Sequence, residues 1–216
     1  MSAFLTMPYS LDIAGVDMKI NPCFRNVLKL QSMFYEKALD EDLKRDIFIY
    51  NLYTEMQKDD FSKLAFMDIN IKAHLVDRGN WFMACGNEKE SKPKKPVLDT
   101  EQDWPYIVPA FLTMGKNLMD PNLEMHWWEF QARIQELPKE CHLVRIMHLR
   151  TLKNEGKLDK KDYKSEREEY NKLGVDVMVI RRFALEKPKT HDERMKMIAA
   201  ISQSYIDEAA KKAGER

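Results

Sequence analysis

Glycine is scarce in this chain, and its scarcity limits the folds that the sequence can adopt. Seven glycines occur among 216 residues, whereas the turns of a β-sandwich or barrel and the phosphate-binding loop of a Rossmann fold depend on glycine. Methionine occurs fourteen times, and Lys, Glu, Leu and Ala are abundant. These residues favour helices. We therefore expect a mainly α fold, a helical bundle with a small N-terminal β-hairpin and a C-terminal amphipathic helix.

The hairpin is predicted from residues 11–20. Leu11 and Ile13 begin an alternation of apolar and other residues that continues on the far side of Ala14-Gly15. Alternation about a turn that contains glycine is typical of two short antiparallel strands.

Helices are predicted over most of the remaining chain, because apolar residues recur there every three or four positions. Asn21 is a candidate N-cap with Pro22 at the first helical position, and Asp40 is a second candidate. Asp120 followed by Pro121 repeats the first pattern. The expected helices cover residues 22–39, 41–56, 61–85, 99–115, 121–137, 139–152, 159–174 and 190–216.

Three positions are expected to shape these helices. Gly79-Asn80 is a candidate interruption of the helix over 61–85, and Pro109 should kink or divide the one over 99–115. Gly174 is a candidate C-cap.

The chain divides into four predicted parts. Residues 1–86 hold the hairpin and the first helices, and residues 99–187 form a second helical part of the same domain. Between them, residues 87–98 contain four lysines and two prolines without apolar periodicity, which predicts an exposed loop. Glutamates interrupt these lysines, so a solvated loop is favoured over a phosphate-binding patch. Residues 188–216 form an extended tail helix.

The charge balance excludes some classes of partner. Thirty-five basic and thirty-five acidic residues give a formal net charge of zero, whereas broad binding to nucleic acid or to an anionic membrane requires a basic surplus. No apolar run approaches a membrane span, and the N-terminus lacks the features of a signal peptide. The three cysteines form no C-x-x-C pair and are expected to be reduced. We expect a soluble intracellular protein without a nucleic-acid or membrane partner.

The stretch "MHWWEF", residues 125–130, contains two of the four tryptophans. In a helix, Trp128 would lie about 100° from Trp127 and would widen the apolar face. The face itself follows helical spacing, through Leu123, Trp127, Phe130, Ile134 and Leu137. Aromatic packing is therefore the favoured interpretation.

A reactive site at this stretch is disfavoured. His126 and Glu129 have a spacing that would allow a shared metal ion, but helical metal sites need further ligands from other helices, and no second pair is evident. Cys85 lacks an oriented histidine, and no nucleotide-binding or serine-nucleophile motif occurs. Arg145 and Arg150 are interpreted as helix-surface charges. We expect no enzyme, no metal and no cofactor.

Several segments together resemble a known family, the gene-product-fifteen proteins of tailed phages that infect Gram-positive bacteria. "INPCFRNVLKL" is similar to the family's I-N-x-x-F-R helix start, and "WFMACG" to its W-F-x-x-C-G element ahead of a lysine-rich loop. "DTEQDWPYIVPAFL", "MHWWEF" and "RIMHLRTL" then resemble an acidic aromatic helix entry, H-W-W-x-F and I-M-x-x-R. The similarity covers residues 11–175. It departs from the family at "TMGKNLMDPNL" and in the tail beyond residue 184.

The resemblance implies a tail assembly chaperone, present in the host cytoplasm and absent from the mature virion. Such a protein binds the tape-measure protein, the long helical ruler of the tail, and delivers it to polymerising tail-tube protein. Self-association is a further expected contact. Because methionine adapts its shape to varied surfaces, a methionine-rich chain suits this role.

Seven residues are predicted to contact a partner or a second copy, with core packing as the alternative, favoured for the tryptophans. They are Trp127, Trp128 and Phe130, with Met195, Ile198, Ile201 and Tyr205 on the tail helix. Two other functions remain open: a structural tail or connector protein retained in the virion, and a phage regulator that binds DNA.

Overall fold

The computed structural model describes residues 7–34, 39–58, 61–87, 97–100 and 102–174. They form eight α-helices and one β-hairpin, which confirms the predicted mainly α fold with an N-terminal hairpin. The predicted tail helix lies outside the described residues.

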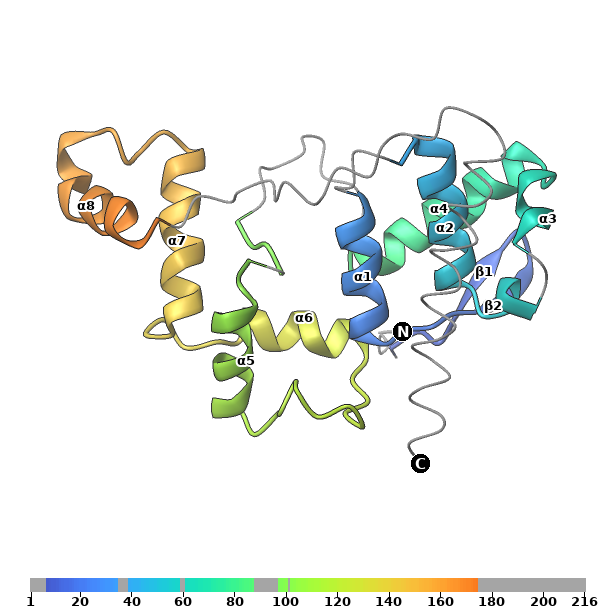
Figure 1. Cartoon of the computed structure of the whole chain (residues 1–216), viewed down its shortest axis with the longest axis horizontal. Coiled ribbons are helices and arrows are strands. Elements are labelled where there is room, and N and C mark those ends of the chain that lie inside the picture. The colour runs from blue at the N-terminus through green and yellow to red at the C-terminus, as the bar shows by residue number, and fades with distance from the viewer. Residues whose placement is uncertain (1–6, 35–38, 59–60, 88–96, 101, 175–216) are drawn as a thin grey trace, which may run out of the picture.

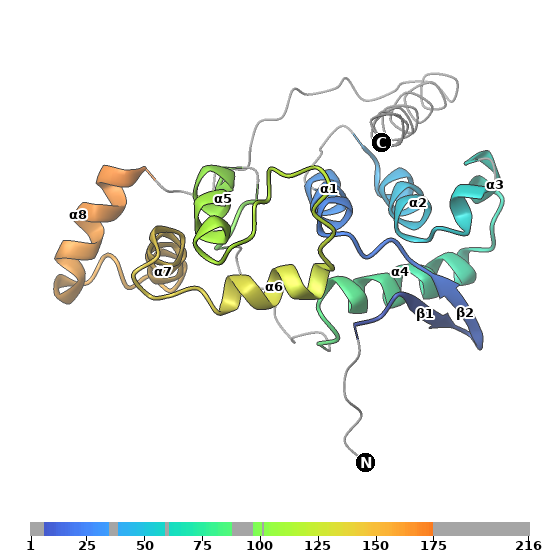
Figure 2. The ribbon, with the colours of Figure 1, turned by 90° about the horizontal axis from the view of Figure 1, so that it is seen from below.

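Figures 1 and 2 show the elements set out along the long axis, from α3 and the hairpin at one end to α8 at the other. The helices are α1 (Phe24–Phe34), α2 (Glu41–Leu52), α3 (Ser62–Ala65), α4 (Ile69–Met83), α5 (Trp104–Thr113), α6 (Trp127–Gln135), α7 (His142–Asn154) and α8 (Lys164–Leu173), with 3-10 turns η1 (Met56–Lys58) and η2 (Lys161–Tyr163).

The hairpin consists of β1 (Ser10–Ile13) and β2 (Val16–Lys19), paired antiparallel. Ala14 and Gly15 have φ angles of 53° and 86°, as a two-residue hairpin turn requires. Leu11 and Ile13 are buried, and β1 packs against α4. The hairpin predicted from residues 11–20 is therefore confirmed.

The starts of α1 and α2 test two predicted N-caps. Asp40 caps α2 as predicted, because its side chain accepts a hydrogen bond from the Leu43 backbone N–H at 2.8 Å. The prediction at Asn21 is wrong by two residues: α1 starts at Phe24, and the Asn21 side chain accepts from Cys23 N–H at 3.2 Å, in a turn ahead of the helix.

The single helix predicted over 61–85 is two helices, and the break is not at Gly79. The break follows Phe66, and Asp68 then caps α4 by accepting from Asn70 N–H at 2.8 Å. Gly79 lies inside α4, where it allows α4 to approach α2 closely. A Cβ atom at residue 79 would stand 2.6 Å from the Phe48 ring and 2.7 Å from Leu52 Cδ2.

Replacing Gly79 with alanine should lower the free energy of unfolding by about 1–3 kcal/mol, because the added methyl group overpacks the contact with α2. Helix propensity alone would favour alanine by roughly 1 kcal/mol. A loss of stability in Gly79→Ala would therefore show that overpacking outweighs helix propensity. Urea unfolding followed by circular dichroism measures it. The control is Asn80→Ala on the exposed side of α4, for which we expect no loss. A stabilised Gly79→Ala protein would contradict this packing.

The second half departs from the sequence prediction mainly at α6. The helix predicted to start after Asp120 starts at Trp127, with His126 as its N-cap. Pro109 lies inside α5 and does not divide it, and Pro105 stands in the first turn. Gly174 ends α8 with a left-handed φ of 59°, which confirms the predicted C-cap.

Among the described residues, two groups of buried apolar side chains form the core. The larger runs from Leu11 to Leu143 in the sequence, so it joins residues from both sides of the loop predicted at 87–98. The smaller lies between α7 and α8 and is centred on Ile146, Leu149 and Tyr170. Most of that loop, residues 88–96, lies outside the described residues.

Candidate functional site

The entry to α6 is joined to the entry to α1 through the backbone. Trp127 N–H donates to the Pro22 carbonyl at 2.8 Å, and Phe24 N–H donates to the Met125 carbonyl at 3.1 Å. The side chains continue the contact, because the rings of Phe24 and Phe130 stack with centroids 5.1 Å apart. The segments "INPCFR" and "MHWWEF" therefore form one structural unit.

Both indoles of the tryptophan pair bind the C-terminal end of α4. Trp127 Nε1–H donates to the Met83 carbonyl and Trp128 Nε1–H donates to the Phe82 carbonyl, each at 2.9 Å. The last carbonyls of a helix lack partners within it. Adjacent tryptophans at the start of α6 thus supply two hydrogen bonds to the last turn of α4.

Trp128 also packs at the edge of an aromatic group on α4. The centroid of its ring lies 5.7 Å from that of Trp81, in an edge-to-face arrangement, and 6.3 Å from that of Phe82, in a stacked arrangement. Gly86 has a φ of 78°, and a Cβ atom there would stand 3.2 Å from Trp128 Cη2. The chain therefore leaves α4 directly against the Trp128 ring, a position for which glycine is suited by both its backbone angle and its size.

The structure separates the predicted partner-binding residues into three sets. Trp127 is 1% exposed and Phe130 is fully buried, so neither ring offers a surface to a partner in this fold, and the core alternative describes them. Trp128 is half-buried. The tail face of Met195, Ile198, Ile201 and Tyr205 lies outside the described residues. Leu123 precedes α6 and is not on its apolar face.

His126 is held by two hydrogen bonds that define its tautomer. Its Nδ1 accepts from Trp128 N–H at 3.0 Å, so the ring proton is on Nε2, which faces the Pro8 carbonyl at 2.9 Å. Burial lowers the pKa of His126 from its ordinary value of 6.5, against smaller raising effects of the Pro8 carbonyl and Glu129. Glu129 instead pairs with Arg133 at 2.8 Å. His126 and Glu129 thus have partners other than a shared metal.

Stability should fall as the pH is lowered below about 6.5, with His126 as one cause. Because its folded-state pKa is depressed, the unfolded chain binds the proton first. The contribution of neutral His126 to the free energy of unfolding is therefore complete above pH 6.5. It is lost as the pH falls through the folded-state pKa. Protonation also places a hydrogen on Nδ1, opposite Trp128 N–H, and removes the cap.

Urea midpoints between pH 5 and pH 8 test this, with His126→Asn as the matched variant, since asparagine caps helices without titrating. The wild-type protein should lose more stability across this range than His126→Asn does. Parallel pH profiles for the two proteins would exclude His126 as the titrating group.

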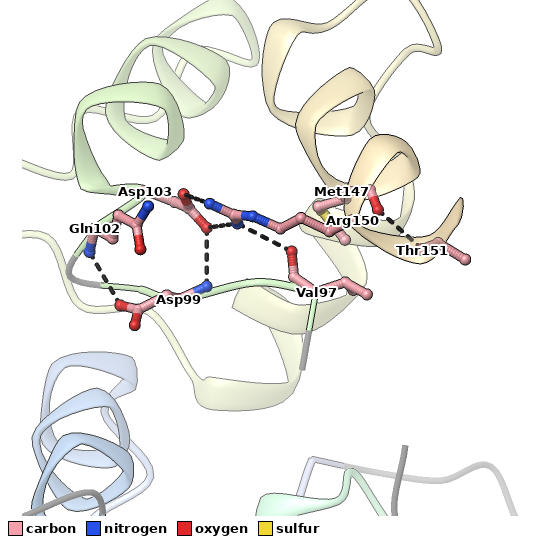
Figure 3. Close-up of polar contacts among 7 residues, drawn as sticks. All are labelled: Val97, Asp99, Gln102, Asp103, Met147, Arg150 and Thr151. Carbon is pink, nitrogen blue, oxygen red and sulfur yellow. Dashed lines mark hydrogen bonds and ion pairs between the residues drawn. The ribbon is translucent and has the colours of Figure 1, made fainter. Parts of the chain in front are cut away.

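A buried ion pair joins α5 to α7, as Figure 3 shows. Arg150 Nη1 and Nη2 donate to the two carboxylate oxygens of Asp103 at 2.5 and 2.9 Å. Arg150 is 2% exposed and Asp103 is fully buried. The interpretation of Arg150 as a surface charge is therefore wrong. Sequence reasoning missed the pair, although both residues stand in segments that carried the family resemblance.

The same two side chains hold the segment that leads into α5. Arg150 Nη1 also donates to the Val97 carbonyl at 3.1 Å, and Asp103 Oδ2 accepts from Asp99 N–H at 2.8 Å. The pair thus fixes the chain where it re-enters the described structure after the lysine-rich loop. By contrast, Arg145 is part-exposed and pairs with Glu169 on α8, in agreement with its prediction as a surface charge.

The surroundings of Cys85 do not activate its thiol. Burial raises the pKa of the Cys85 thiol to about 11, so the thiol is protonated at neutral pH and a poor nucleophile. Cys23, Cys85 and Cys141 are all free thiols. Within the described residues, no three His, Cys, Asp or Glu side chains gather as metal ligands would. Among the same residues, no helix has the length and apolar character needed to cross a bilayer.

The arrangement defines a helical protein whose distinctive motifs pack against one another. "MHWWEF" binds "INPCFR" and the end of α4, and Asp103 of the α5 entry binds Arg150 of the "RIMHLRTL" segment.

A family model described as "Bacteriophage Gp15 protein" matches residues 5–175. The chain therefore belongs to the bacteriophage Gp15 family, and this membership supports a phage structural or assembly protein. No curated protein and no solved structure matched the chain.

Proposed function

We propose that the protein is a non-catalytic tail assembly chaperone that binds the tape-measure protein and promotes polymerisation of tail-tube protein around it. The observation that carries the proposal is the family match over residues 5–175. The protein would act in the host cytoplasm and be absent from the finished virion.

The exposed side chains of the described structure support a binding role. A chaperone for a long helical partner must offer apolar contacts at its own surface, as grooves that receive amphipathic helices do. Large apolar side chains that are more than a third exposed occur along the chain, at Met7, Tyr9, Val16, Phe34, Phe66, Ile69, Ile71, Leu112 and Met119.

The polar groups at the centre of the fold support a non-catalytic role. His126 caps a helix, and the Asp103–Arg150 pair joins two helices. In the described structure these side chains are engaged with the protein itself.

The test is co-expression with the tape-measure protein of the same phage. We expect the tape-measure protein to be insoluble alone and to become soluble and co-purify when the chain is present. An unrelated helical protein of similar length serves as the client control, and it should not be rescued. Failure of the chain to bind both the tape-measure protein and the tail-tube protein would overturn the proposal.

Mass spectrometry of purified virions separates a chaperone from a structural tail or connector protein. A chaperone should be missing from particles that contain the tail-tube protein at full abundance. Recovery of the chain at a fixed ratio to the tube protein would instead establish a retained structural component.

A further inference from the structure

The segment ahead of α6 already contains the beginning of a helix. The Asp120 side chain accepts a hydrogen bond from Asn122 N–H at 2.9 Å, which is the bond that an N-cap residue makes to the second residue of a helix. Pro121 stands between them, at the helical position that favours proline. Leu123 N–H donates to the Asp120 carbonyl at 3.1 Å and closes one turn. The helix does not continue from this turn, because α6 begins only at Trp127.

Arg25 of α1 occupies carbonyls that a continuing helix would need. Its guanidinium donates to the carbonyls of Asp120 and Leu123 at 2.6 and 2.7 Å, and to that of Leu118 at 3.1 Å. In a helix that continued from Pro121, the first two carbonyls would instead accept the backbone N–H groups four residues further along the chain. A charged donor binds a carbonyl more strongly than a neutral N–H does, so Arg25 favours the interrupted form.

Two backbone N–H groups at the start of α6 take part in the same choice. Trp127 N–H donates to the Pro22 carbonyl at 2.8 Å, and Trp128 N–H donates to His126 Nδ1 at 3.0 Å. In a continued helix, each of these N–H groups would donate to the carbonyl four residues earlier in the chain. Because each N–H has one hydrogen to donate, the observed hydrogen bonds and those of a continued helix exclude each other.

The local sequence favours the continued helix. Residues 121–126 contain no glycine and no β-branched side chain, and Leu123, Glu124 and Met125 are strong helix formers. Glu124 would also stand in the first turn, where the helix dipole stabilises a negative charge. The local signals therefore favour a helix that begins at Pro121, and the contacts with α1 and its entry oppose it.

We propose that α6 is a two-state helix, short in the described structure and extended back to Pro121 when Arg25 and the Pro22 carbonyl release the segment. The transition exchanges hydrogen bonds with α1 and its entry for hydrogen bonds within α6. It also opens the joint between "INPCFR" and "MHWWEF", because the Pro22 carbonyl loses its donor. By reciprocity, a partner that separated these segments would lengthen α6, and a partner that bound the long helix would separate them. The inference does not rest on the proposed chaperone function.

The variant Arg25→Met in the full-length chain tests the switch, because methionine keeps an unbranched side chain but lacks the donors. Backbone Cα chemical shifts from NMR spectroscopy show which residues are helical. Helical shifts should begin at Trp127 in the wild-type protein and at Pro121 in Arg25→Met. The ratio of long to short α6 should rise at least about tenfold, because hydrogen bonds from a charged group stabilise more than neutral ones do.

Two further variants distinguish a switch from a simple loss of contacts. Adding Asp120→Ala to Arg25→Met removes the N-cap, so the ratio of long to short α6 should fall again by about fivefold. Fraying of the segment alone would neither produce helical shifts nor make them depend on Asp120. Arg25→Lys keeps the charge but lacks the planar fork, so it should give an intermediate ratio, and it decides the question if Arg25→Met does not fold.

The matched control is Arg45→Met on α2, where Arg45 pairs with Asp42 at 3.1 Å. Helical shifts of α6 should begin at Trp127 in this variant, as in the wild-type protein. Non-helical shifts at residues 121–126 in every folded Arg25 variant would overturn the proposal. So would helical shifts that persist undiminished after Asp120→Ala.

Discussion

Replacing Arg150 with methionine should lower the free energy of unfolding by about 3–5 kcal/mol, because removal of one partner leaves the other charge of a buried pair uncompensated. Asp103 is fully buried, and the loss would leave its carboxylate with the Asp99 N–H. The Val97 carbonyl would lose its donor at the same time. Urea unfolding followed by circular dichroism measures the change.

The matched control is Arg145→Met, one helical turn and a half earlier on α7. Arg145 pairs with Glu169, and their side chains are 37% and 33% exposed. Solvent screens such a pair, so we expect a loss of about 0–1 kcal/mol. Equal losses for Arg145→Met and Arg150→Met would contradict the central role of the buried pair.

A double variant separates the ion pair from its hydrogen bonds to the backbone. Asp103→Leu combined with Arg150→Met removes both charges, which is often neutral where apolar side chains replace the pair. Here the Val97 carbonyl and the Asp99 N–H would still lose their partners. We therefore expect the double variant to recover only part of the stability lost in Arg150→Met.

Replacing Trp127 with alanine should lower the free energy of unfolding by about 3–5 kcal/mol, the usual range for a large aromatic side chain removed from a core. Trp127 is 1% exposed, and its ring stacks on Phe130 with centroids 5.6 Å apart. Trp128→Ala should cost less, because Trp128 is only half-buried. Both are measured by far-ultraviolet circular dichroism, since fluorescence would change with the tryptophans themselves.

Phenylalanine variants isolate the two indole hydrogen bonds. Trp127→Phe and Trp128→Phe keep an aromatic ring but remove the donors to the Met83 and Phe82 carbonyls, each at a cost of about 1 kcal/mol. If Trp128→Ala destabilised the protein more than Trp127→Ala, the assignment of Trp127 to the core would be wrong.

The sequence predicted the elements whose signals are local. The hairpin depends on a two-residue turn with positive φ at Ala14 and Gly15. The Asp40 cap and the Gly174 C-cap likewise depend on the residue itself and on its immediate neighbours. Such signals act over a few residues, so they can be read without knowledge of the rest of the chain.

The wrong helix starts have a common physical cause, which is competition from distant backbone partners. Asn21 N–H donates to the Leu52 carbonyl at 2.8 Å, and the Pro22 carbonyl accepts from Trp127. Residues 21 and 22 are therefore part of a contact between segments and cannot begin α1. A proline that follows an asparagine favours a helix start only where no such contact competes.

The same cause delays α6. The Asp120 side chain accepts from Asn122 N–H in a local turn at 2.9 Å. Arg25 then donates to the carbonyls of Leu118, Asp120 and Leu123, at 3.1, 2.6 and 2.7 Å. These bonds hold the segment ahead of α6 in a non-helical form. No pattern within residues 118–126 predicts contact with Arg25, which lies 93 to 98 positions away in the sequence.

By itself, the sequence determined the helical class, the hairpin, two of the caps and the resemblance that led to the Gp15 family. Only the tertiary structure decided that Trp127 is buried while Trp128 is half-buried, and that Arg150 is buried with Asp103. Helical spacing specifies which side chains share a face, but burial depends on which other elements cover that face. The hydrogen bonds and ion pairs that decide this join residues far apart in the chain, and their energies arise only after the helices have packed.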